Sequence, residues 1–327
     1  MTHLGKALAL AGLALAVWLF LRDDPQTIIA LLGQAGLGLA AASVIHVLPM
    51  ALNARGWQIL LPGAGRPTLL SMLRIVWIRE SVNGLLPVAR IGGELVSFRL
   101  MREIGVRRAP AAASLVVDMA LCILCQLAFT LLGVALLATY QTNDLALRLG
   151  AGVAVMMPIA AIFILVQYAS PFERIVRSIN HFAAGKLDGI VGHSARIDRA
   201  VRTMYRRRGT IVRSLIWQFG GFLAGAVEIW AALWILGHPV GPTEALAIEA
   251  VIMAVSSVGF LVPGAIGIQE GSFLVIGSVV GLDPSTALAL AAARRLRDCL
   301  VFFPGLLAWH VSEGHQLRRV KAAQRPL

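Results

Sequence analysis

Two glutamates follow glycine breaks in otherwise apolar sequence. Glu94 comes directly after Gly92 and Gly93, and Glu270 comes three residues after Gly267. A helix that begins at such a break leaves its first backbone N–H groups unpaired, and the helix dipole places partial positive charge there. These helix starts could bind an anionic group, with the two glutamates gating access. A structural interpretation stays open beside it, because each glutamate could satisfy its own helix start or pair with an arginine.

A second group of charges lies in the last apolar segment, where Arg294, Arg295, Arg297 and Asp298 occur within five residues. On a helix, Arg294, Arg297 and Asp298 share one face, and Arg295 points about 100° away. An Arg294–Asp298 ion pair would leave Arg297 or Arg295 to bind a substrate or one of the two glutamates. Asp118, a carboxylate in an earlier apolar segment, is the predicted partner of Arg294. A structural clamp is a somewhat better prediction for this pair than substrate contact.

The composition indicates what surrounds these charges. Of the 327 residues, 58% are hydrophobic and only 14% are charged, whereas a soluble domain carries about 25% charged residues. The sequence therefore predicts an all-α, polytopic transmembrane helical bundle. The net charge of +12 does not indicate nucleic acid as a partner, because the basic residues lie between apolar spans and follow the positive-inside rule. A single charge at the bilayer centre costs roughly 2.5–3.5 kcal/mol, so the intramembrane charges must be paired or line a watery cavity.

Two segments are too short on one side of a break to cross a bilayer, which needs about 20 helical residues. The first is residues 68–100 and the second is residues 243–281. Each is predicted to be a re-entrant hairpin, and the residues at the two breaks are Pro87, Gly92 and Gly93 in the first and Pro263, Gly264 and Gly267 in the second. Broken helices with charges at membrane depth are typical of substrate pathways.

The two hairpins belong to an internal repeat. Aligned on their prolines, the segments match without a gap over about 32 residues, and the matched positions include Glu94 with Glu270, Gly105 with Gly281, Ala111 with Ala287, Ala113 with Ala289, and Asp118 with Arg294. The predicted topology sends the hairpins into the membrane from opposite faces. The repeat is therefore inverted, a geometry that suits alternating access around a midplane polar cavity.

The sequence predicts a single integral membrane domain. Residues 1–168 form the first half, 169–213 a basic amphipathic cytoplasmic segment, and 214–327 the second half. The basic segment is predicted to lie against anionic inner-leaflet lipids, although it could serve only to fix the topology. Both termini are predicted to be cytoplasmic.

The sequence does not identify a single proton-carrying or catalytic group. Glu80, Glu228, Glu244 and Glu249 lie in or near the spans, and a buried carboxyl can exchange protons near neutral pH; the sequence does not select one. The seven histidines form no metal-like pair on a span, and no hydrolase, zinc or nucleotide-binding motif is present. We expect no cofactor, no metal and no enzymatic activity.

Four stretches give the chain a family resemblance: LLPVARIGGELVSFRLM, VVDMAL, FLVPGAIGIQEGSF and ARRLRDCLVFFPGLLAW. They resemble the transmembrane region of lysylphosphatidylglycerol synthases, the flippase-like domains, and are most similar to the subgroup associated with bacterial hopanoid biosynthesis. The similarity runs from about Leu31 to Trp309. It implies a bacterial inner-membrane protein that moves or presents a lipid, and it places motif positions at Pro87, Arg90, Glu94, Pro263, Glu270 and Arg294. The synthases add a soluble aminoacyl-transfer domain that this chain lacks, so we do not expect it to make an aminoacylated lipid.

The leading hypothesis is thus a lipid translocase or lipid-transport protein, for a hopanoid or an anionic lipid. Arg90 with Arg294, Arg295 or Arg297 would bind the headgroup in a polar cavity, while the two glutamates gate it or pair with the arginines. Two alternatives remain: a lipid-modifying enzyme that uses an intramembrane carboxylate, or a non-catalytic scaffold of a lipid-biosynthesis complex. The lipid itself, its direction of movement, the energy source and the oligomeric state are not predicted.

Overall fold

The computed structural model describes residues 18, 21–22, 25–63, 66–86, 92–140, 188–258 and 265–323. Within these ranges every regular element is a helix, which confirms the predicted all-α class. Three of the described helical stretches are long and apolar enough to cross a membrane: Pro25–Leu60, Arg108–Leu137 and Arg208–Ile235. The prediction of a polytopic helical bundle is therefore confirmed.

The described helices form two series in chain order. The first series is α2 (Pro25–Ser43), the short 3-10 turn η1 (Val44–His46), α3 (Val47–Leu60), α4 (Leu69–Leu85), α5 (Gly92–Glu103) and α6 (Arg108–Tyr140). The second is α9 (Asp188–Arg206), α10 (Arg208–Ile235), α11 (Pro242–Val258), α12 (Ile268–Val279) and α13 (Pro284–Ala323).

The last two helices of each series repeat at a constant offset. Helices α5 and α12 start at residues 92 and 268, and α6 and α13 start at 108 and 284, so both pairs are 176 residues apart. The turn between them is also repeated. Gly105 and Gly281 have φ angles of 89° and 84°. The amide that follows each glycine donates to a carbonyl five residues earlier, Val106 to Met101 at 3.0 Å and Leu282 to Gly277 at 2.8 Å. This is the Schellman way of ending a helix.

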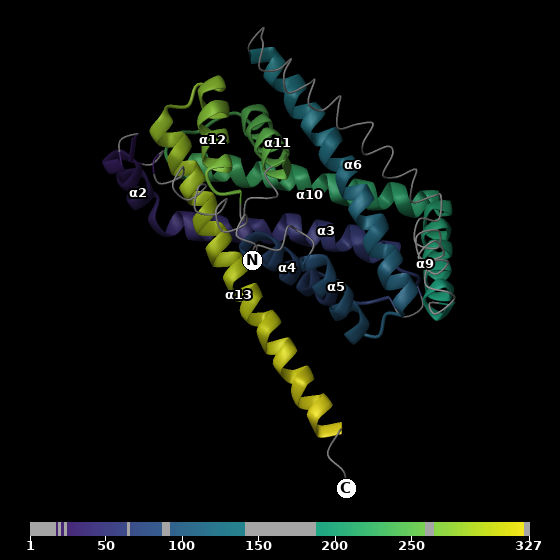
Figure 1. Cartoon of the computed structure of the whole chain (residues 1–327). Coiled ribbons are helices and arrows are strands. Elements are labelled where there is room, and N and C mark those ends of the chain that lie inside the picture. The colour runs from purple at the N-terminus through teal and green to yellow at the C-terminus, as the bar shows by residue number, and fades with distance from the viewer. Residues whose placement is uncertain are drawn as a thin grey trace.

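Helix packing follows the same symmetry. At the centre, α3 lies against α10, and Figure 1 shows the two running in opposite directions. On one side α4 packs on α13, and on the other α11 packs on α6. Likewise α2 packs on α13 as α9 packs on α6, and each hairpin consists of two helices in contact, α4 with α5 and α11 with α12. Each contact is thus matched by one in which the two halves exchange roles, as an inverted repeat requires.

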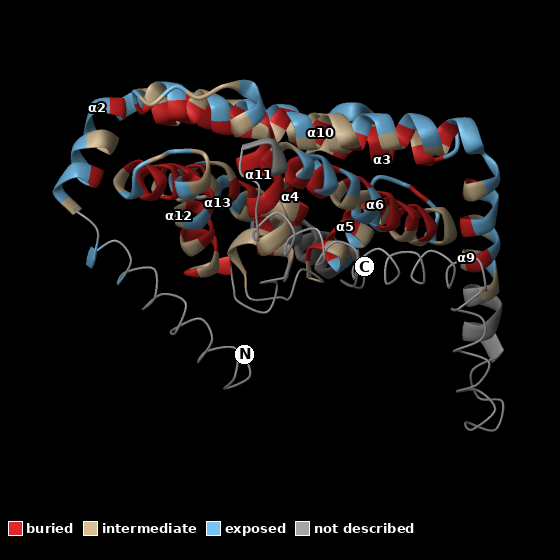
Figure 2. Cartoon of the chain, turned by 90° about the horizontal axis from the view of Figure 1, so that it is seen from above, coloured by how far each residue is buried: buried red, intermediate tan, exposed pale blue. Residues whose placement is uncertain are grey.

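The outer side of α3 and α10 is exposed and largely apolar, whereas their buried residues face the other helices (Figure 2). In Figure 2, buried residues of α3 and α10 face the other helices, and exposed residues line the outer side. The exposed residues of α10 are largely apolar and include Ile216, Trp217, Val227, Trp230 and Trp234. A continuous exposed apolar face of this kind is suited to lipid contact.

The two breaks lie where helices begin. Helix α3 ends at Leu60, and its Ala54, Trp57 and Leu60 are buried. Gly92 and Gly93, predicted at the first break, form the first turn of α5. In the second hairpin, Gly267 is the N-cap of α12, with a φ of 83°.

Part of the basic segment is described, and it packs on protein. Helix α9 crosses the end of the bundle beside the start of α10 (Figure 1). Its Val201 and Met204 are buried in the core that also holds residues of α3, α4 and α6. Residues 169–187, which carry the amphipathic pattern predicted to lie on the membrane, are outside the described residues.

The repeated glycine turn gives the first prediction. A Cβ added at Gly105 or Gly281 meets open space, so the cost of alanine comes from its left-handed backbone alone. We expect Gly105→Ala and Gly281→Ala each to lower the free energy of unfolding by about 1 kcal/mol, measured by denaturant unfolding in detergent micelles. Gly271→Ala is the control, because Gly271 lies inside α12, also faces open space and has no positive φ. Equal stability of all three variants would contradict this account of the turn.

Candidate functional site

The first charge cluster is centred on Arg79 of α4. Its Nη1 lies 3.0 Å from Oδ2 of Asp118 on α6, and its Nη2 donates to Oδ1 of Asn53 on α3 at 2.9 Å. Gln218 of α10 donates to the other oxygen of Asp118 at 2.8 Å. The guanidinium carbon also lies 5.1 Å from the ring centroid of Trp57, in cation–π range. Asp118 is only 1% exposed, so its charge depends on these partners.

Glu94 borders this cluster through a close helix contact. Its Oε1 lies 3.9 Å from Nε of Arg79, a distance of charge attraction without a hydrogen bond. The position of α5 is fixed by Gly93, whose amide donates to Oδ1 of Asn83 at 2.9 Å. A Cβ at Gly93 would lie 2.5 Å from the carbonyl oxygen of Arg79. Glycine there lets the start of α5 lie against the α4 backbone, which brings Glu94 to Arg79.

The second charge cluster is built on α13. Arg294 binds Glu249 of α11 with both terminal nitrogens, and the Nη2–Oε1 distance is 3.1 Å. One turn further along, Nη1 of Arg297 lies 2.9 and 3.1 Å from the two oxygens of Glu228 on α10. The ring of His46, from η1, lies between Arg297 and Glu228. This cluster thus joins three helices of the second half to a residue of the first.

Glu270 has two roles in the same cluster. One carboxylate oxygen accepts a hydrogen bond from the amide of Gly267 at 2.7 Å, which caps the start of α12. The other lies 2.7 Å from Nε of Arg295. Glu270 is 2% exposed, and both of its oxygens are bound. Asp298 lies between the two neighbouring arginines, 2.6 Å from Arg297 and 3.9 Å from Arg295.

The predicted pairings are partly wrong. Asp118 does not meet Arg294, because Arg79 and Gln218 occupy both of its oxygens. Arg294 does not pair with Asp298 either, since Glu249 holds its guanidinium from across the helix interface. The pairing of Glu270 with one of the three arginines is present, with Arg295.

Several predicted residues are outside the described part of the chain. Arg90, Pro87, Pro263 and Gly264 all fall there, so the structure does not place them relative to the clusters.

Other important residues were not singled out in the sequence. Glu228 was one of four candidate proton carriers among which the sequence did not select, and Arg79, Asn53, Gln218 and His46 were not assigned a role. The one sequence signal that could have identified them is the presence of a polar residue inside an apolar segment. A histidine or glutamine within a long apolar segment must find a polar partner.

A small cavity adjoins the second cluster. Its volume is about 20 Å³, and Ser43, Glu228, Arg294 and Arg297 contribute polar groups to a lining that is otherwise apolar. This is room for one water molecule and not for a lipid headgroup. Among the described residues, Glu228, Arg294 and Arg297 of the second cluster border this cavity, which leaves no space for a larger ligand.

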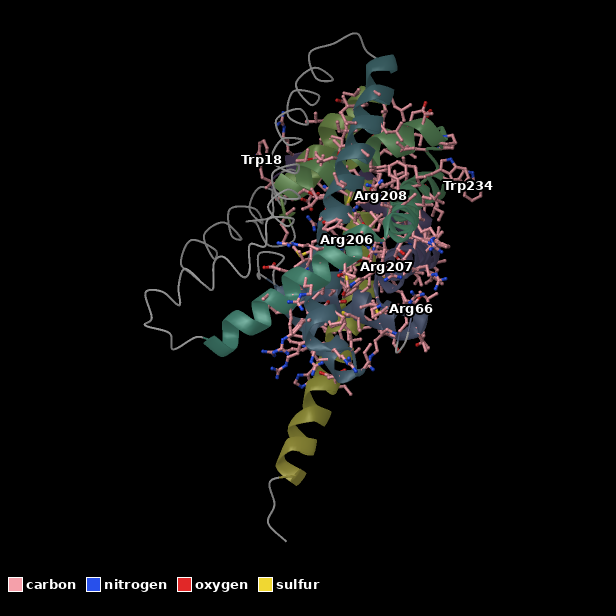
Figure 3. The ribbon with its side chains drawn as sticks, turned by 90° about the vertical axis from the view of Figure 1, so that its right-hand side faces the viewer. Trp18, Arg66, Arg206, Arg207, Arg208 and Trp234 are labelled. Carbon is pink, nitrogen blue, oxygen red and sulfur yellow. The ribbon has the colours of Figure 1, made fainter. Side chains whose placement is uncertain are left out.

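A basic face lies at the end of the bundle where α9 meets α10. Figure 3 looks onto this end and shows Arg66, Arg206, Arg207 and Arg208 near one another. Partial burial lowers the pKa of the Arg66 guanidinium from its usual value, and the like charges of Arg207, Arg55 and Arg213 lower it further. Mutual repulsion of this kind is relieved when anions approach the face.

The ion pairs generate the second prediction. Removing one partner leaves an uncompensated buried charge, so we expect Arg294→Leu and Glu249→Leu each to lower the free energy of unfolding by about 3–5 kcal/mol. The double variant should lose much less than the sum, because no lone charge remains. Thermal unfolding of the four proteins in one detergent measures the cycle. His238→Gln is the control, since its ion pair with Asp283 is exposed and should contribute under about 1 kcal/mol. Additive losses in the double variant would contradict the pairing.

The comparisons with known proteins found one matching family model. Residues 6–305 match a family model described as the lysylphosphatidylglycerol synthase TM region. The match covers nearly the whole chain and confirms the predicted resemblance. No curated protein and no solved structure matches the chain. The hopanoid-associated subgroup stays a prediction.

Proposed function

The chain belongs to the family of lysylphosphatidylglycerol synthase transmembrane regions, and from this premise we propose that it carries a membrane lipid from one leaflet to the other. Membership indicates a role connected with membrane lipids. The finer assignment, a flippase-like transporter of a bacterial inner membrane with both termini in the cytoplasm, is our proposal. It is supported by the inverted repeat and by the basic face at one end of the bundle.

One observation carries the proposal: a polar side chain from each half binds a buried carboxylate of the other half. Gln218 of the second half binds Asp118 of the first, and His46 of the first half binds Glu228 of the second. Packing of apolar side chains alone could hold two halves together without the cost of burying charge. Ion pairs that exchange partners offer a route by which a polar headgroup can pass, because the groups that close the path can also solvate it.

The packing suggests which elements move. Helices α3 and α10 lie together at the centre, and each hairpin rests on the long helix of the other half, α4 on α13 and α11 on α6. Rocking one half against the other around the central pair would open one end of the interior and close the opposite end. We assign a gating role to Glu270, because it fastens the start of α12 to Arg295 of α13 within the second half, and breaking this pair would free the hairpin helix to move. Glu94 has the corresponding position beside Arg79.

The charges of the interior favour one class of headgroup. Among the described residues of the two clusters, four guanidinium groups face a larger number of carboxylates: Arg79, Arg294, Arg295 and Arg297 against Glu80, Glu94, Asp118, Glu228, Glu249, Glu270 and Asp298. The arginines are already paired, which weakens the argument for an anionic headgroup. We therefore favour a neutral or amine-bearing lipid, such as a hopanoid, as cargo. Anionic inner-leaflet lipids are the expected neighbours of the basic face.

Lipid movement in proteoliposomes tests the gating role. We expect Glu270→Gln to change the rate of transbilayer movement of a fluorescent phospholipid by about tenfold or more. The reason is that the amide keeps the helix cap but loses the charge that binds Arg295. Glu94→Gln should have a smaller effect, since its contact with Arg79 is longer. Glu103→Gln, an exposed carboxylate at the far end of α5, is the control and should match the wild type. Unchanged rates in both Glu94→Gln and Glu270→Gln would exclude the gating role.

A headgroup panel tests the cargo. We expect fluorescent phosphatidylethanolamine to move faster than fluorescent phosphatidylglycerol in the same vesicles, because the excess of carboxylates attracts an amine. Mass spectrometry of the recovered lipids should find both unmodified. A chemically altered lipid would favour the enzyme alternative, and faster movement of the anionic lipid would overturn the preference for an amine.

A further inference from the structure

His46 occupies an unusual place in the fold. It ends η1, the 3-10 turn that joins α2 to α3, within a stretch long and apolar enough to span the membrane. Its side chain is only 13% exposed. The ring meets that of Phe302 edge-on, with centroids 5.6 Å apart. An imidazole held this deep in an apolar span normally has both ring nitrogens accounted for.

One ring nitrogen lies between an acceptor and a donor. Nδ1 of His46 is 2.8 Å from Oε2 of Glu228 and 2.7 Å from Nη1 of Arg297. If Nδ1 carries a hydrogen, it donates to the glutamate. If it carries none, it accepts from the arginine. The protonation state of this nitrogen therefore decides which of two hydrogen bonds forms.

The other ring nitrogen faces a second carboxylate. Nε2 lies 3.8 Å from Oε2 of Glu80 on α4 and has no hydrogen-bond partner among the described residues. A neutral ring can offer a hydrogen to only one of the two glutamates, whereas an imidazolium offers one to each. A small approach of α4 would complete the second bond.

The remaining charged groups around the ring come from three described helices. Helix α10 contributes Glu228, α13 contributes Arg297 with Asp298 beside it, and α4 contributes Glu80 with Arg79 beside it. The single nearby guanidinium that touches the ring also binds Glu228. One more positive charge at His46 would thus lie between carboxylates from the two halves, Glu80 of the first and Glu228 of the second.

We propose that His46 is a proton-binding site whose occupancy clasps the two halves of the protein together. A proton taken up by the ring gives an imidazolium that donates through Nδ1 to Glu228 and through Nε2 to Glu80, joining α10 to α4. Its release leaves Nδ1 to accept from Arg297 and leaves the two carboxylates to repel one another, which loosens the contact between the halves. Coupling of this step to lipid movement rests on the proposed function, but the proton site itself does not.

Imidazole titration tests the site directly. The full chain, labelled with ¹⁵N-histidine in lipid nanodiscs, is followed by NMR from pH 5 to 9, and the His46 signal is assigned by its loss in His46→Gln. We expect one reversible protonation step at His46. In Glu80→Gln and in Glu228→Gln the step should move to lower pH by about 1 unit or more, because each removes a carboxylate that stabilises the imidazolium. A ring that does not titrate in this range, or whose step stays at the wild-type pH in both variants, overturns the proposal.

A distance measurement tests the clasp. Spin labels are placed on exposed positions of the two halves, Leu70 of α4 and Val212 of α10, after the three native cysteines have been replaced. The label-to-label distance should change between pH 5 and pH 8 in the wild type and in the control His238→Gln, but not in His46→Gln. Glu80→Gln serves as a second variant if His46→Gln does not fold, and it should also abolish the change. A pH response that survives in both variants overturns the proposal.

These readouts separate the two ideas. If the wild type moves no lipid at any pH yet His46 titrates and the distance responds, the transport function fails and the proton site stands. If lipid moves at the same rate at all pH values and the distance is constant, the clasp fails and transport stands.

Discussion

The rest of the structure depends on one constraint, that a charge buried among apolar helices must have an opposite charge or a polar group within reach. Asp118 meets this constraint with Arg79 and Gln218, and Arg294 meets it with Glu249. In each case the partner comes from another helix. The charges therefore contribute to the specificity of helix packing. They specify which helices lie next to each other and at what register, because a shift of one turn would leave a carboxylate or a guanidinium alone.

The two halves share a scaffold but not a charge pattern. The glycine turns at Gly105 and Gly281 are built with the same hydrogen bonds at the same offset. By contrast, Asp118 and Arg294 hold equivalent positions and carry opposite charges, and their partners Arg79 and Glu249 are not equivalent in the repeat. Backbone geometry is thus repeated where the fold needs it, whereas the interior differs between the halves.

The sequence predicted what depends on local pattern. Apolar runs with few charges predicted the spans, and the alignment of Pro87 with Pro263 predicted the register that α5 and α12 follow. Partner choice could not be predicted, because it depends on the distances between helices that are far apart in sequence. Asp118 and Arg294 were paired from their equivalence in the repeat, although equivalent residues of an inverted repeat need not be near one another. His46 was missed for a related reason: its neighbours Glu80 and Glu228 come from two other helices, 34 and 182 residues away along the chain.

The exchange of packing between the halves has a consequence for how the chain is made. Helix α6 is completed early in synthesis, yet the hairpin helix that covers it, α11, follows more than a hundred residues later, and α4 likewise waits for α13. Each half can form its own main ion pairs, Arg79 with Asp118 and Arg294 with Glu249, but the surface of α6 that α11 covers has no protein partner until the second half is made. The chain therefore acquires its complete set of interhelix contacts only after α11 and α13 have been inserted.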